Sequence, residues 1–114
     1  MKFMLLIVGG DPRLPQPTDA DMGTMLAQFE QIGADLGGQG KLVHSARLRP
    51  AGEAKTVRLG RDGKRTLVDG PFTETKEAVG GYYLGDFASE AEALEWARKF
   101  PPFFHIEVRQ VWEM

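Results

Sequence analysis

The chain has 114 residues and a mass of 12.6 kDa, which suits a single domain over residues 1–114 with its own hydrophobic core. It lacks cysteine, which excludes disulfides, thiolate metal sites and cysteine nucleophiles. Fourteen basic and sixteen acidic residues give a net charge of −2, so the chain as a whole does not attract nucleic acid. Its longest wholly apolar run, residues 3–8, is far too short to span a membrane. We therefore expect a cytoplasmic protein that binds neither membranes nor nucleic acids.

The first half of the chain predicts a strand, a helix and a second strand. Residues 2–8 predict a strand with both faces covered, because residues 3–8 are apolar at both parities. Thr18 is a typical N-cap, and apolar residues recur at helical spacing from there to Gly37-Gly38. Residues 41–48 then alternate as a half-buried strand does.

A β-hairpin is predicted next, over residues 56–69. Asp62-Gly63 is typical of a two-residue turn, and in that register Val57 faces Val68 while Leu67 lies on the other side. The segment 41–65 carries eight basic and two acidic residues. Such a block is typical of a solvated hairpin, or of a surface that attracts an anionic ligand or partner.

The last third predicts a strand at 81–87, a helix opened by the capping box at Ser89 and a final strand at 106–112. In that final strand, Trp112 would share the core face with Ile106 and Val108. The order βαβ, hairpin, βαβ predicts a ferredoxin-like α+β layer, with two helices on one face of a mostly antiparallel sheet. The first strand needs cover on its other face as well, and the simplest cover is the sheet of a second copy.

One segment is more specific than these patterns. Asp69-Gly-Pro-Phe-Thr-Glu-Thr-Lys-Glu77, followed by Gly80-Gly81-Tyr82, resembles the signature of the YCII-related, DGPF-type family. The resemblance implies a dimeric α/β barrel, in which two ferredoxin-like sheets pack face to face around clefts. It implies no assigned activity. Genes of this type often neighbour those of extracytoplasmic-function sigma factors.

Two residues are candidates for acid–base catalysis. Asp69 precedes the rigid turn at Pro71. Either its side chain caps that turn, or the turn directs its carboxylate into an inter-sheet cleft. His44 is the second candidate, because histidine is the side-chain type suited to moving protons at neutral pH. Strand parity places it with Leu42 and Leu48 and therefore toward the helices.

Three further residues are candidates for substrate binding. Arg109 lies on the strand face opposite the core, where a guanidinium binds carboxylate or phosphate; an ion pair with Glu107 is the alternative. Glu74 belongs to the acidic turn, and Tyr82 offers a phenol if it faces the cleft. Two histidines without cysteine disfavour a tight transition-metal site, so no metal is predicted, and a site of histidine with carboxylates is the alternative; nothing indicates a cofactor.

Two functions therefore remain open. The first is cofactor-free proton transfer on a small molecule in the cleft of a homodimer. The second is non-catalytic binding of a ligand or partner, as an accessory to sigma-factor regulation.

Overall fold

The computed structural model describes residues 1–71 and 77–113. Its elements follow the predicted order: β1 (Lys2–Gly9), α1 (Asp19–Gly38), β2 (Leu42–Arg47), a 3-10 turn η1 (Ala51–Glu53), β3 (Lys55–Leu59), β4 (Arg65–Asp69), β5 (Ala78–Asp86), α2 (Glu90–Ala97) and β6 (His105–Gln110). Glu74 lies outside the described residues.

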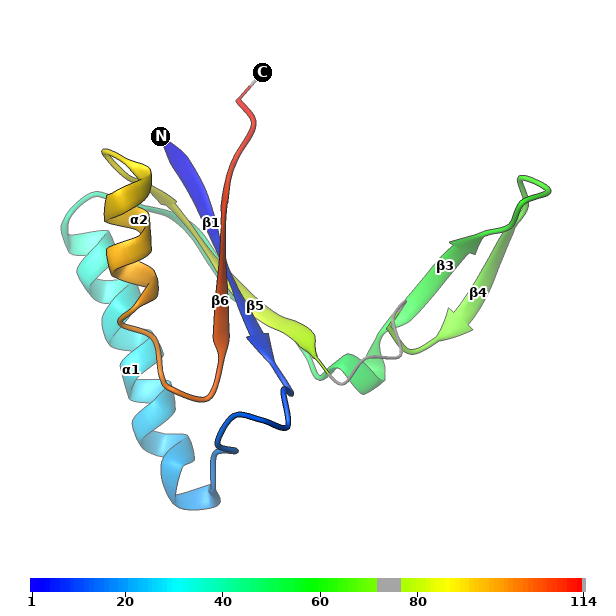
Figure 1. Cartoon of the computed structure of the whole chain (residues 1–114), viewed down its shortest axis with the longest axis horizontal. Helices are drawn as coiled ribbons and strands as arrows, with labels where there is room; N and C mark the ends of the chain where they lie inside the picture. Colours follow the sequence, from blue (N-terminus) through cyan, green and yellow to red (C-terminus); the bar gives the residue numbers. More distant parts are fainter. Residues whose placement is uncertain (72–76, 114) are drawn as a thin grey trace.

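Four strands form one antiparallel sheet in the order β2-β5-β1-β6, while β3 and β4 form a separate two-stranded sheet. Both helices lie on the same side of the larger sheet (Figure 1). This is an α+β arrangement that agrees with the predicted ferredoxin-like layer. Neither helix in the described part of the chain is long and apolar enough to cross a membrane.

The core lies between the larger sheet and the helices. Phe3, Leu5 and Ile7 are buried there, packed with Leu36 of α1 and Trp96 of α2. The strand residues between them point the other way, because successive side chains of a strand alternate between faces.

The face of the larger sheet that the helices leave uncovered is called the outer face below. Its centre is apolar and partly exposed: Met4, Leu6 and Val8 of β1, with Tyr82 and Leu84 of β5. The sequence prediction that the first strand needs cover on both faces thus corresponds to an apolar surface that residues 1–71 and 77–113 leave partly exposed.

The hairpin from Lys55 to Asp69, called the arm below, projects away from the rest of the chain (Figure 1). Its predicted register is wrong by one residue: Val57 pairs with Leu67, not with Val68. The reason is a three-residue loop, since the N–H groups of Gly60 and Gly63 bond to the carbonyls of Lys64 and Gly60. Gly63 has φ +81°, as a type I turn followed by a left-handed residue requires.

The prediction that Trp112 lies in the core is also wrong, because its side chain is 87% exposed. Strand β6 runs antiparallel to β1, and Gln110 already pairs with Phe3 near the start of β1. Beyond that point there is almost no neighbouring strand to continue the sheet.

Candidate functional site

A buried carboxylate lies at the end of β1. Asp11 follows a turn at Gly10, where φ is +92°, and is only 2% exposed. It is the single buried charged residue in the described part of the chain. Its backbone carbonyl accepts a hydrogen bond from Gln16 Nε2 at 3.0 Å, which fixes the loop after the strand.

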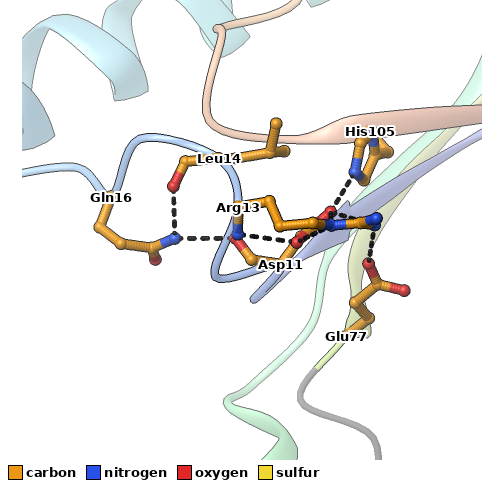
Figure 2. A network of polar contacts seen from close by, with 6 residues as sticks. All are labelled: Asp11, Arg13, Leu14, Gln16, Glu77 and His105. Carbon is orange, nitrogen blue, oxygen red and sulfur yellow. Dashed lines mark hydrogen bonds and ion pairs between the residues drawn. The ribbon is translucent and has the colours of Figure 1, made fainter.

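Two side chains contact this carboxylate and a third contacts one of these two. Together the four residues are called the Asp11 cluster: Asp11, Arg13, His105 and Glu77 (Figure 2). His105 Nε2 lies 2.7 Å from Asp11 Oδ2. Arg13 approaches with two guanidinium nitrogens, Nε at 3.0 Å from Oδ1 and Nη2 at 2.9 Å from Oδ2. Glu77 Oε1 lies 3.9 Å from Arg13 Nη2, at the rim of the cluster.

The cluster keeps the carboxylate ionised. Hydrogen bonds from the Arg13 side chain, then from His105 and the Arg13 backbone, hold the pKa of Asp11 well below its usual range. The same contact raises the pKa of Arg13. Asp11 is therefore an anion at any physiological pH, fixed against one nitrogen of an imidazole.

This pairing sets the chemistry of His105. With its Nε2–H donated to Asp11, a neutral imidazole leaves Nδ1 as a free base. The His105 side chain is about half exposed, at 49%, so a ligand can approach it. A base oriented by a buried carboxylate is an arrangement suited to proton transfer.

The same residues also have the composition of a cation site. Ligand atoms of Asp11, Glu77 and His105 all lie within 4.8 Å of one another. However, the guanidinium of Arg13 already lies between the two carboxylates, so a metal ion would have to displace it (Figure 2). As it stands, the arrangement suits a proton-transfer pair better than a metal centre.

The structure joins two of the residues proposed from sequence. His44 Nδ1 lies 2.7 Å from the Tyr82 hydroxyl oxygen. The parity argument that placed His44 toward the helices is wrong, because a bulge between Leu42 and His44 shifts the register. His44 pairs with Leu84 and lies on the outer face.

Arg109 lies on the same face but at the opposite edge of the sheet. It pairs with Met4 on β1, and its guanidinium is 4.0 Å from Glu107. Neighbouring strands are about 4.8 Å apart, so the three intervals between β2 and β6 separate Arg109 from His44 by roughly 14 Å.

Asp69 lies elsewhere. It ends the arm, where its exposed carboxylate accepts a hydrogen bond from Lys55 Nζ at 2.6 Å. The chain therefore gathers His44, Tyr82 and Arg109 on its outer face and holds Asp69 in a different sheet.

Sequence patterns do not point to the Asp11 cluster, because the segment Gly9-Gly10-Asp11-Pro12 is typical only of a turn that ends the first strand. The pairing of the first and last strands is the feature that could have indicated the contact between Asp11 and His105. His105 starts the last strand and pairs with Val8 at the end of the first, so a turn there brings residue 11 to the imidazole. The two residues are 94 positions apart, and only the pairing of the first and last strands connects them.

The fold and this site together define a small α+β domain with a polar cluster at the end of β1 and the start of the edge strand β6. The chain belongs to the family of proteins with a YCII-related domain, whose family model matches residues 1–114. It is also 51% identical over 59 residues to an uncharacterized protein of Rhizobium meliloti (strain 1021). That match covers 52% of the chain and 47% of the relative, about half of each.

Proposed function

We propose that the protein is an enzyme that moves a proton on a small molecule, with His105 as the general acid and base. The observation that carries this proposal is the 2.7 Å contact between the buried Asp11 carboxylate and the half-exposed imidazole. Asp11 is a positioning residue in this proposal, because its carboxylate accepts the hydrogen bond from Nε2 and fixes the orientation of the imidazole.

The ligand would lie on the outer face, next to His105. His105 pairs with Val8, whose side chain belongs to the outer face, so the imidazole lies at the edge of that face. Arg109 would bind an anionic group of the ligand, and Tyr82 with His44 would contact its other end. A small carbon acid with a carboxylate fits these groups, because a general base acts on its C–H and a guanidinium binds its charge.

We further propose that the protein is a homodimer, with the outer face of each chain turned toward the other copy. The support is the apolar centre of that face, which the helices of the same chain cannot reach. A ligand would then lie in an enclosed cleft, where water is excluded and charge–charge interactions are stronger.

The test is deuterium incorporation from solvent into a panel of 2-oxo and 3-oxo carboxylic acids, followed by NMR. We expect exchange of at least one compound to be faster with the protein, and about 100-fold slower or more with His105→Gln. Asp11→Asn should also slow the exchange, whereas Glu95→Gln, an exposed change on α2, should leave it unchanged.

Two results would overturn the proposal. One is a panel in which no compound exchanges faster with the protein than in buffer. The other is equal exchange by the protein and by folded His105→Gln. Saturable binding of a panel compound without any exchange would instead favour the non-catalytic binding protein.

A further inference from the structure

We infer that the arm of each chain packs its apolar side on a second copy of the chain and forms part of the cleft there. This inference rests on the proposed homodimer and adds a specific segment to its interface. It concerns a surface, the arm from Lys55 to Asp69, to which the proposed chemistry assigns no role.

The register of the hairpin creates that surface. Because Val57 pairs with Leu67 and Leu59 with Arg65, three apolar side chains gather on one side of the arm. Val57, Leu59 and Leu67 are 59%, 61% and 68% exposed. With the two-residue turn predicted from sequence, Leu67 would have been on the opposite side from the other two.

The arm has little support from its own chain. Within the described residues, its two strands are not part of the larger sheet and pair only with each other. An isolated two-stranded hairpin is marginally stable at best in water. A hairpin with an apolar side therefore needs a surface to pack on, and the arm points away from its own body (Figure 1).

The surface of the chain is too large for a monomer of its mass. The accessible surface is 8144 Å², whereas a compact monomer of 12.6 kDa exposes roughly 6,200 Å². The radius of gyration is 16.1 Å, against about 13 Å for a compact chain of this length. A standard interface buries about 800 Å² on each partner, so the excess is enough for a large interface between two copies.

Charge also favours a second copy. The arm carries five basic and two acidic residues, a formal charge of +3, which leaves −5 on the rest of a chain whose total is −2. The arm of one copy is therefore attracted to the body of another. On that body, the outer face offers the apolar surface that matches Val57, Leu59 and Leu67.

This packing has a consequence for the cleft. Asp69 and Lys55 end the arm on the same side as its apolar residues. An arm that packs on the second copy brings Asp69 and Lys55 next to the other chain's outer face, and Asp69 then joins His44, Tyr82 and Arg109 of that chain. The cleft then contains residues of both chains.

The experiment compares Leu67→Asp with Thr66→Asp. The two positions are adjacent and both exposed, but Thr66 lies on the other side of the arm with Arg58. Sedimentation velocity over a dilution series gives the dimer dissociation constant of each variant. Hydrogen exchange of the wild-type arm amides, measured at high and low protein concentration, reports packing of the arm without any substitution.

We expect Leu67→Asp to weaken the dimer by about 100-fold or more, since each dimer loses two buried leucines and gains two desolvated carboxylates. Thr66→Asp should change the dissociation constant by less than about 3-fold. The arm amides of the wild type should be protected at high concentration and lose that protection on dilution.

The inference is overturned if the two variants dissociate equally, or if the arm amides exchange at the same rate at all concentrations. A third variant, Leu6→Asp on the outer face, separates this failure from that of the dimer itself. If Leu6→Asp dissociates the dimer and Leu67→Asp does not, the dimer forms through the outer face and the arm does not contribute to it. If the wild type is monomeric at micromolar concentration, both the dimer and the packing of the arm are rejected. The deuterium assay tests the acid–base proposal independently of these results.

Discussion

Gly81 allows strands β2 and β5 to lie close together, and substituting it should weaken the sheet. A Cβ atom built at Gly81 would lie 2.8 Å from the carbonyl oxygen of Ala46, which belongs to the neighbouring strand. Because that oxygen is backbone, no side-chain rotation relieves the contact and the strands must separate. The neighbouring Gly80 has no heavy atom within 4 Å of such a Cβ atom.

The expected effect follows from these distances. Overpacking of this kind destabilises the fold by about 1–3 kcal/mol. Replacing glycine by alanine also lowers the conformational entropy of the unfolded chain, which stabilises the fold by about 0.4–1 kcal/mol. Gly81→Ala should therefore destabilise by about 1–2 kcal/mol. An unfolding entropy of about 2.1 cal/mol/K per residue makes this roughly 4–8 °C in melting temperature for a chain of this length.

The assay is thermal unfolding by circular dichroism at one protein concentration, with Gly80→Ala as the matched control. Gly80→Ala should melt at the wild-type temperature or up to about 4 °C above it, since it gains only the entropy term. The steric argument is refuted if Gly81→Ala melts with the control. A wider β2–β5 spacing would also disturb the contact between His44 and Tyr82, so the functional pair depends on this glycine.

Three further predictions concern local features. Gly63→Val should destabilise the arm by about 1–3 kcal/mol, since a β-branched residue resists φ +81°, and faster hydrogen exchange of arm amides would report it. Tyr83→Phe should lower the free energy of unfolding by about 1 kcal/mol in urea, because the hydroxyl donates to the Phe29 carbonyl at 2.7 Å; an unchanged midpoint would contradict this. The hydrogen bond from Lys41 lowers the pKa of Glu92, so its stabilisation is present above the unfolded pKa of about 4.3 and is lost as pH falls through the folded value. The stability gap between wild type and Glu92→Gln should accordingly narrow as pH falls below about 4.3, and a constant gap would count against the ion pair.

Local sequence patterns were sufficient for most of the fold. Helix α1 begins after Thr18 because that side chain and Asp21 form a capping box, and such signals lie within a few residues of each other. The hairpin shows the limit of this reasoning. Asp62-Gly63 correctly located the turn, but both two- and three-residue loops accommodate a glycine with positive φ. The length of the loop determines on which side of the arm Leu67 lies.

The candidate site was harder to predict because its contacts are long-range. Tyr82 contacts His44 on the outer face only because a bulge in β2 reverses the parity that the sequence implies. Asp11 was read as a turn residue, since nothing near it in the chain indicates an imidazole partner. Its burial and its ionised state are properties of the folded structure.

The position of the Asp11–His105 pair also has a consequence for biosynthesis. Asp11 leaves the ribosome 94 residues before His105, which begins β6, so the pair does not exist until β6 has joined β1. A nascent chain that has already folded α1 and α2 would hold the carboxylate with Arg13 alone. Proton-transfer chemistry would thus appear only in the completed fold, and any substrate turnover would report that the first and last strands have closed the sheet.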